Sequence, residues 1–186
     1  LYRIHLNEKL DLQIPGETKP VIKNPSFKSW HKSMTLPQMA YGYEMQITPL
    51  QMLSFYNAVA NDGKYIAPIF VREIRRLGNP IKQFKARVIN EQICSPKTIK
   101  KLQAMLEGVV TEGTGKLMGS PLYRVAGKTG TAQVADGRNG YRAKRSYQAS
   151  FCGYFPADNP KYSIIVAING AKNSNYGSTL ARAEFK

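Results

Sequence analysis

Cysteine, histidine and acidic residues are scarce in this chain of 186 residues. Its two cysteines, Cys94 and Cys152, are too few for a disulfide scaffold at this length. Neither belongs to a Cys-x-x-Cys pair, and His5 and His31 are remote from both in sequence, so no four-ligand zinc site is predicted. We expect two free, buried thiols.

Long apolar runs are also absent from the sequence. No stretch approaches the roughly 20 apolar residues that cross a bilayer as a helix. Residues 1–5 contain no initiator methionine, no apolar signal-peptide core and no small-residue cleavage site. Nothing in these 186 residues therefore predicts an anchor or an export signal.

The shortage of acidic residues leaves a formal net charge of +15, from 27 basic and 12 acidic side chains. A strongly basic surface favours anionic partners such as nucleic acid or an anionic envelope surface. The basic residues are spread along the chain, with clusters at 72–76, 97–101 and 138–145. Such clusters are typical of solvated faces, and they do not predict a nucleic-acid module. The loop from Asp136 to Arg145 is either a solvated connection or a cleft rim that contacts substrate or a partner.

Two helices are well signalled, each by a capping residue followed directly by proline. The first is capped by Thr48 and closed by Asp62-Gly63, and the second is capped by Ser95 and ended by Gly113. Both carry apolar residues at helical spacing, which predicts that one face of each is buried.

The remaining segments are irregular or extended in pattern. Residues 1–40 are rich in proline and lysine and are expected to be irregular. Strands are predicted over four ranges: 65–74, 123–132, 148–155 and 162–169. The last two are joined by a short turn-rich link at 156–160 and predict a hairpin. Helices followed by antiparallel strands indicate the α+β class.

The most informative string is Val125-Ala126-Gly127-Lys128-Thr129-Gly130-Thr131-Ala132-Gln133. Its Gly-Lys-Thr part has the ending of a phosphate-binding loop. That motif needs a glycine at position 122, which is Leu, and a helix starting at the Lys-Thr pair. The flanks have a strand pattern instead, so the phosphate-loop interpretation fails on spacing and context.

A second interpretation is the Lys-Thr-Gly strand of penicillin-recognising enzymes. An edge strand lets a peptide substrate add as another strand. Lys128 would supply a positive charge for a substrate carboxylate, and Thr129 and Thr131 would supply hydroxyl groups that bind it. Gly130, which has no side chain, would let the substrate approach the backbone closely. The N–H of Thr131 would serve as one oxyanion donor, worth roughly 3–4 kcal/mol in comparable sites.

The whole chain is similar to the C-terminal part of the transpeptidase domain of class B penicillin-binding proteins. Matching stretches occur in the expected order at 12–17, 36–43, 48–51, 56–63, 106–114, 125–133 and 149–156. The stretches at 56–61 and 149–156 look most like the cell-division branch. We therefore expect residues 1–186 to be the C-terminal portion of one transpeptidase domain.

The family's Ser-x-x-Lys and Ser-x-Asn motifs should precede this region. No Ser-x-Asn occurs in these residues, and the one Ser-x-x-Lys, at Ser29 and Lys32, lies between Pro25 and Pro37. These prolines leave too little room for a stable buried helix, so we interpret this match as a coincidence. The nucleophilic serine is expected upstream of Leu1.

The resemblance implies a five-stranded antiparallel sheet with flanking helices, of which this chain supplies three strands, the outer one carrying Lys128. It implies peptidoglycan D,D-transpeptidation through a serine acyl-enzyme that β-lactams would also form. Stem peptides, β-lactams and cell-wall synthesis or division proteins are the implied partners, with no nucleic acid, metal or organic cofactor. The implied location is the periplasmic face of the inner membrane, with an anchor upstream of this chain.

Other functions share parts of this evidence. A β-lactamase or D,D-carboxypeptidase of the same superfamily would carry the same Lys-Thr-Gly strand, although the stretches at 41–63 and 149–156 argue against a hydrolase. A β-lactam sensor domain would be acylated without turning over stem peptides. A polyanion-binding module would depend on the net charge alone and would bind DNA with a steep salt dependence.

Overall fold

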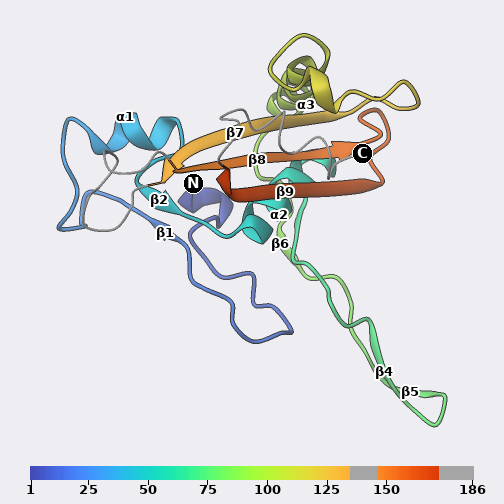
Figure 1. Cartoon of the computed structure of the whole chain (residues 1–186). Helices are drawn as coiled ribbons and strands as arrows, with labels where there is room; N and C mark the ends of the chain where they lie inside the picture. Colours follow the sequence, from blue (N-terminus) through green and yellow to red (C-terminus); the bar gives the residue numbers. More distant parts are fainter. Residues whose placement is uncertain (135–145, 172–186) are drawn as a thin grey trace.

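Three long antiparallel strands form the main sheet of the computed structural model, which describes residues 1–134 and 146–171. Strands β7 (Ala126–Val134), β8 (Ser146–Phe155) and β9 (Tyr162–Ala171) are adjacent in that order (Figure 1). Strand β8 is therefore central, and β7 forms one edge of this sheet among the described strands. Helices pack against the sheet, which confirms the predicted α+β class.

Helix α2 (Pro49–Ala60) begins where the sequence predicts. The Thr48 hydroxyl accepts a hydrogen bond from the Gln51 N–H, and the Gln51 side chain accepts one from the Thr48 N–H. This capping box satisfies two backbone donors that the first turn of a helix otherwise leaves unpaired. After the last turn, Gly63 adopts a φ of 99° and donates its N–H to the Ala58 carbonyl.

Helix α2 identifies one face of the sheet. The Asn57 amide of α2 donates a hydrogen bond of 3.2 Å to the Ser163 hydroxyl of β9. Cross-strand partners share a face, so Tyr154, opposite Ser163, lies on this face, and so does Cys152 two residues earlier. Lys128 is opposite Cys152 on β7 and therefore lies on the α2 side of the sheet.

Helix α3 (Pro96–Thr111) links α2 to the start of β7. Its cap is the predicted Ser95, whose hydroxyl accepts the Thr98 N–H at 3.2 Å. Near the middle of α3, the Gln103 amide donates to the Val59 carbonyl of α2 at 2.9 Å. At its end, Val110 packs into a buried cluster with Met118, Val125 and Phe151, which places the segment after α3 beside β7.

The prediction that residues 1–40 are irregular is wrong in three places. A 3-10 turn (η1, Tyr2–Ile4), a short strand (β1, Val21–Ile22) and a short helix (α1, Thr35–Ala40) occur there. Strand β1 pairs with β2 (Met45–Gln46). These elements are too short to leave a periodic pattern, and Pro37 lies in the first turn of α1, where its missing N–H costs nothing.

The predicted strand over 65–74 is wrong in its extent. The structure divides it between two separate two-stranded ribbons, with Pro68 in the connection between them. Their strands are β3 (Tyr65–Ile66) paired with β6 (Val88–Asn90), and β4 (Glu73–Arg76) paired with β5 (Asn79–Gln83). Proline cannot donate to a strand ladder, which explains why β3 stops before it.

The three strands of the main sheet differ from their predicted limits only at the ends. Strand β7 starts at Ala126 and not at residue 123, because Tyr123 stacks on Phe155 with ring centroids 5.1 Å apart. Strands β8 and β9 are each slightly longer than predicted, and the hairpin joining them is confirmed. The basic loop from Asp136 to Arg145 lies outside the described residues.

The cysteines are both free thiols, but only Cys152 is buried, while Cys94 is half-buried. Burial raises the pKa of the Cys152 thiol to about 12. Within residues 1–134 and 146–171, no group of histidine, cysteine or acidic side chains is arranged to hold a metal ion. The helices of this part of the chain are all too short or too polar to cross a bilayer.

Candidate functional site

The Lys-Thr-Gly string lies in extended conformation on β7. One side of this strand pairs with β8 along its whole length, from Ala126 opposite Tyr154 to Val134 opposite Ser146. No other described strand pairs with the second side. The sequence-predicted site residues therefore lie on an edge strand, the position from which an extended ligand can be bound.

Two contacts identify the backbone groups of β7 that point away from β8. The Gln133 N–H donates to the Tyr43 hydroxyl at 3.4 Å, and the Thr129 carbonyl accepts from the Lys128 ammonium at 2.9 Å. Alternate residues of a strand direct their backbone groups to the same edge. The N–H of Thr131, which lies between these two residues, therefore also points to the outer edge.

Lys128 is exposed, and its ammonium group is held at this outer edge by the Thr129 carbonyl. It forms no ion pair with any carboxylate in the described part of the chain. The positive charge is therefore not neutralised by a neighbouring described residue, and an anionic ligand group at this edge would meet it directly.

Thr129 and Thr131 point to the opposite face of the sheet from Lys128, as alternation predicts. Thr129 is opposite Phe151, which is fully buried on that face. The Thr129 Oγ1 atom lies 2.9 Å from Oγ1 of Thr114, in the segment after α3. The structure therefore gives Thr129 a side-chain partner, and it leaves Thr131 exposed.

Two glycines of β7, Gly127 and Gly130, lie close to atoms of the neighbouring strand β8. A Cβ atom at Gly130 would lie 2.6 Å from Oγ of Ser150 on β8. A Cβ atom at Gly127 would lie 2.5 Å from Cζ of Phe151 and 2.6 Å from the Cys152 carbonyl oxygen. Backbone atoms of β8 therefore exclude a side chain at Gly127, whereas the Ser150 hydroxyl beside Gly130 can rotate away, so ligand approach remains the reason predicted for Gly130.

Hollows lie on two sides of these residues. One, of about 330 Å³, is at the C-terminal end of β7 and is lined by Gln38, Tyr41, Tyr43 and Gln133. The other, of about 390 Å³, is on the Lys128 side of the sheet. Its lining residues come from β8, β9, the start of α2 and the segment 42–47 that contains β2, and include Ser150, Ile165, Ala167, Thr48 and Met52.

The alternative nucleophile, Ser29, is not in a helix. Ser29 and Lys32 lie in two separate turns, with the irregular residues Trp30 and His31 between them, and the side chains of Ser29 and Lys32 are exposed. A Ser-x-x-Lys pair acts as a unit only when one helical turn brings the hydroxyl to the amine. The prediction that this match is not a helical motif is confirmed.

Comparison with protein families shows which family the chain belongs to. Residues 1–186 match the family model described as the penicillin binding protein transpeptidase domain. The chain belongs to this family. The class B assignment suggested by the sequence is confirmed by its relatives.

Curated relatives in this family carry transpeptidase names. The chain is 31% identical to the probable peptidoglycan D,D-transpeptidase PbpC of Pseudomonas aeruginosa over 98% of its own length and 30% of that protein. It is 30% identical to the peptidoglycan D,D-transpeptidase FtsI of Buchnera aphidicola, over 99% of the chain and 31% of the relative. The chain thus spans about a third of these proteins.

Solved structures of the family have the same fold. The chain superposes on apo penicillin-binding protein 3 of Mycobacterium tuberculosis with a TM-score of 0.84 and 28% identity, over 100% of the chain and 44% of that structure. Structures of the same mycobacterial protein complexed with ampicillin and with aztreonam match with TM-scores of 0.82 and 0.83.

Two contacts of the candidate site on β7 were not assigned from the sequence. Tyr43 and Thr114 both lie in stretches that carry the family resemblance, at 36–43 and 106–114, but no role was predicted for either. Their hydroxyls contact the backbone of Gln133 and the side chain of Thr129, respectively. Only the position of these stretches in the resemblance could have signalled them, since a single hydroxyl residue in a loop predicts no partner.

Proposed function

We propose that the protein containing this chain is a peptidoglycan D,D-transpeptidase that works through a serine acyl-enzyme, and that β7 binds the donor stem peptide. One observation carries the proposal: the outer edge of β7 presents the Lys128 ammonium, the Thr129 carbonyl and the Thr131 N–H together. A peptide ending in a carboxylate can add to such an edge as a further strand.

Each group has a role in acyl transfer. Lys128 binds the carboxylate of the terminal D-Ala from one face of β7, and the hydroxyls of Thr129 and Thr131 reach it from the other face around the outer edge of the strand. The Thr131 N–H donates to the oxygen of the attacked carbonyl, where negative charge develops in the transition state. The serine oxygen bonds to the carbonyl carbon of the penultimate D-Ala, and the peptide bond to the terminal D-Ala breaks as its nitrogen is protonated. The amine of a second stem peptide then displaces the serine and forms the cross-link.

The nucleophile in this proposal comes from residues outside the chain. The hollow of about 390 Å³ lies on the same face of the sheet as Lys128. It is lined by Ser150, which is opposite Gly130, and by Ile165, which is opposite Cys152. A segment bearing the serine and its activating lysine would fit against this face. The transpeptidase names of the curated relatives support the reaction.

The remaining expectations follow from this function. We propose that β-lactams acylate the same serine, which the ampicillin and aztreonam complexes of the mycobacterial relative support. We place the protein at the periplasmic face of the inner membrane, anchored outside these residues, with cell-wall synthesis or division proteins as partners. Membrane fractionation with protease protection tests that location.

The experiment uses the protein that contains this chain, with its nucleophile. Lys128→Ala is expected to slow acylation by a fluorescent penicillin by about a hundred-fold or more. Lys161→Ala, at an exposed lysine in the β8–β9 turn, is the matched control and should acylate normally. Donor and acceptor stem peptides are then supplied together. Cross-linked product supports the proposal, whereas hydrolysis alone indicates a carboxypeptidase, and acylation without turnover indicates a sensor domain.

A further inference from the structure

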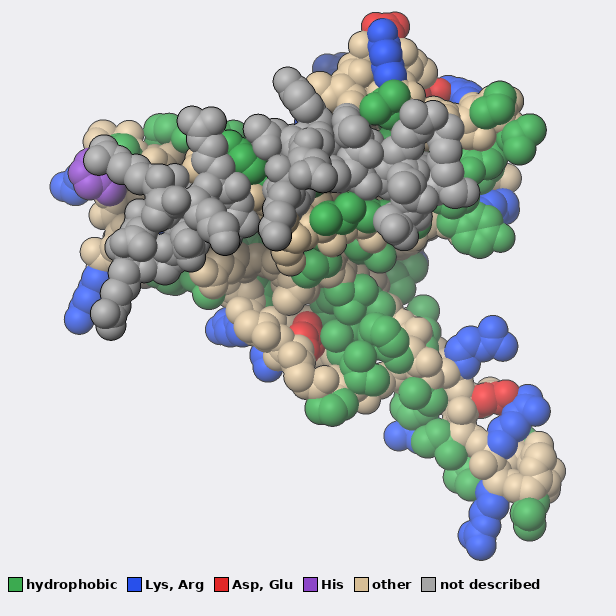
Figure 2. All heavy atoms as spheres, in the orientation of Figure 1, with side chains coloured by type: hydrophobic (Ala, Val, Ile, Leu, Met, Phe, Trp, Pro, Cys, Tyr) green, Lys and Arg blue, Asp and Glu red, His purple; other side chains and the backbone are tan. Residues whose placement is uncertain are grey.

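The ribbon of β4 and β5 projects away from the rest of the protein. It occupies residues 70–87, and its turn is the part most distant from the main sheet (Figure 1). In Figure 2, basic side chains extend from it in several directions and apolar atoms lie between them. Nothing in the site on β7 requires this ribbon.

The base of the ribbon is fixed to the N-terminal segment. The Gln13 side chain accepts hydrogen bonds of 2.9 Å from the N–H groups of Phe70 and Val71 and donates one of 3.0 Å to the Val71 carbonyl. On the other strand, the Arg87 guanidinium donates to the Leu10 carbonyl at 2.5 Å. These contacts tie both strands to the body, so the turn is presented in a defined direction.

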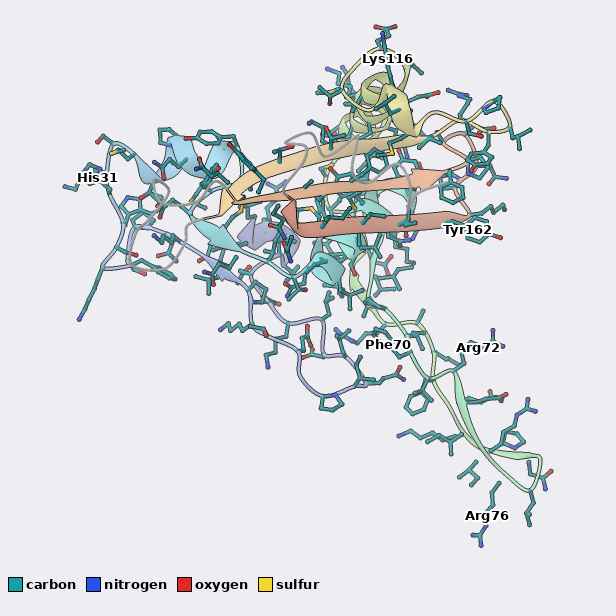
Figure 3. The ribbon with its side chains drawn as sticks, in the orientation of Figure 1. His31, Phe70, Arg72, Arg76, Lys116 and Tyr162 are labelled. Carbon is teal, nitrogen blue, oxygen red and sulfur yellow. The ribbon has the colours of Figure 1, made fainter. Side chains whose placement is uncertain are left out.

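The composition of the ribbon is both basic and apolar. Six basic residues and one acidic residue, Glu73, give residues 70–87 a net charge of +5. All six basic side chains are exposed: Arg72, Arg75, Arg76, Lys82, Lys85 and Arg87. Figure 3 shows Arg72 along the ribbon and Arg76 at its far end. The cations therefore line both strands as far as the turn.

The turn itself carries an apolar residue against local preference. Leu77 and Gly78 have φ values of 50° and 82°, and Leu77 is 95% exposed. Asn-Gly or Asp-Gly is the usual pair for a turn with two positive φ values, because a branched apolar side chain is strained there. Ile81, 63% exposed, lies close to it in sequence. The Leu77 side chain buries almost none of its apolar surface within the described residues, and a ligand could cover it.

We propose that the tip of this ribbon, residues 75–81, inserts end-on into the surface of an anionic lipid bilayer. Leu77 and Ile81 would enter the boundary between headgroups and acyl chains, and Arg75, Arg76 and Lys82 would contact lipid phosphates. The chemistry is complementary, because the tip is apolar and the surrounding side chains are cationic. This proposal is independent of the function proposed for β7.

Two observations favour a bilayer over a macromolecular partner with its own fold. Basic side chains extend from the ribbon in several directions (Figure 2), whereas a rigid partner would contact mainly the side that faces it. The tip comprises only seven residues, far fewer than the roughly 20–30 that each side of a standard protein interface contributes. A bilayer accepts a narrow apolar tip surrounded by cations without requiring shape complementarity.

The test places an environment-sensitive dye at the tip of the full protein that contains this chain. Asn79→Cys carries the dye, in a background where Cys94 and any other exposed cysteine are replaced by serine. Vesicles of phosphatidylcholine, with or without about one third phosphatidylglycerol, are then added. We expect a blue shift, and quenching by lipid-borne quenchers, with the anionic vesicles only. The same dye at Lys161→Cys, in the β8–β9 turn, is the control. A blue shift there would show that another surface of the protein approaches the vesicles.

Two variants separate the contributions at the tip. Leu77→Asn suits the positive φ better, so it should keep or raise thermal stability while weakening vesicle binding roughly tenfold. Replacing Arg75, Arg76 and Lys82 by Gln should weaken vesicle binding by about tenfold or more. The same replacement at Lys97, Lys101 and Lys116, which lie outside the ribbon, should weaken vesicle binding much less. The proposal is overturned if the tip dye ignores anionic vesicles, if Leu77→Asn binds as well as the parent, or if polyglutamate shifts the dye and vesicles do not.

Discussion

The Oγ1 atoms of Thr114 and Thr129 lie 2.9 Å apart, which joins the segment after α3 to the Lys-Thr-Gly strand. Thr114 is 15 residues away from Thr129 in sequence and is itself exposed. A threonine hydroxyl has one proton to donate, so this contact limits the rotamers in which Thr129 can meet a ligand. Thr114 is in this sense a positioning residue for the proposed carboxylate site.

Thr114→Val removes this hydroxyl at nearly constant volume. We expect the rate constant of acylation at low penicillin concentration to fall about fivefold, because one neutral hydrogen bond contributes about 1 kcal/mol. The loss should appear mainly in the apparent affinity, since the proposed role of Thr129 is to bind the carboxylate and not to react. Stopped-flow acylation over a range of penicillin concentrations separates the two parameters.

The control variants distinguish positioning from general damage. Thr114→Ser keeps the hydroxyl and should restore most of the activity. Thr111→Val removes an exposed hydroxyl that donates to the Gly108 carbonyl at 3.5 Å within α3, and should leave acylation unchanged. Equal losses in Thr114→Ser and Thr114→Val would show that the contact with Thr129 has no role.

The two glycines Gly127 and Gly108 should respond in opposite directions to the same change. Gly127→Ala forces a methyl group against Phe151 and the Cys152 carbonyl, and should lower the free energy of unfolding by about 1–3 kcal/mol or more. Gly108→Ala in α3 meets no atom within 4 Å and should raise it by about 0.5–1 kcal/mol. Urea unfolding of both variants decides the point, and a stabilised Gly127→Ala would contradict the packing.

Local signals in the sequence were sufficient for the helices and the site strand. Thr48 and Ser95, each followed by proline, specify where α2 and α3 begin because capping depends on neighbouring residues only. The Lys-Thr-Gly string could be placed on an edge strand from its family resemblance and its flanking pattern.

Features that depend on distant residues could not be predicted in this way. The strand predicted over 65–74 spans β3 and only the start of β4, and β5 was not predicted, because the pattern does not show that Pro68 separates two pairings. The contact of Thr114 with Thr129 requires that the end of α3 pack beside β7, which Val110 and Phe151 bring about. No spacing rule connects such residues before the tertiary structure is known.

Cys152 should resist modification in the folded protein. Burial raises its pKa to about 12, so almost none of it is thiolate at pH 8, and the thiolate is the reactive form. We expect a maleimide at pH 8 to label Cys94, which is half-buried, much faster than Cys152. Peptide mass spectrometry after a timed reaction measures both sites, and denaturant should make their rates similar. Fast labelling of Cys152 in native buffer would show that the interior of the sheet opens readily.

The carboxylate of Asp62 should make a small, pH-dependent contribution to stability where α2 meets α3. It accepts hydrogen bonds from the Lys100 ammonium at 3.0 Å and the Gln103 amide at 3.1 Å, and these bonds hold its pKa below the ordinary value of 3.8. Because the pKa is lower in the folded state, the stabilisation is complete above pH 3.8. It is lost as the pH falls through the pKa of the folded state.

Asp62→Asn is therefore expected to lower the free energy of unfolding at pH 7 by less than about 1 kcal/mol, since the group is exposed and screened by solvent. The difference from the parent protein should shrink as the pH is lowered below 3.8, because both then carry a neutral side chain. Urea unfolding at pH 7 and at successively lower pH measures this difference. Asp158→Asn, at an exposed carboxylate of the β8–β9 turn, is the control. If the difference in free energy of unfolding between the parent protein and Asp62→Asn grew in acid, the pH dependence would have the opposite sign. The contact with Lys100 could then not be its source.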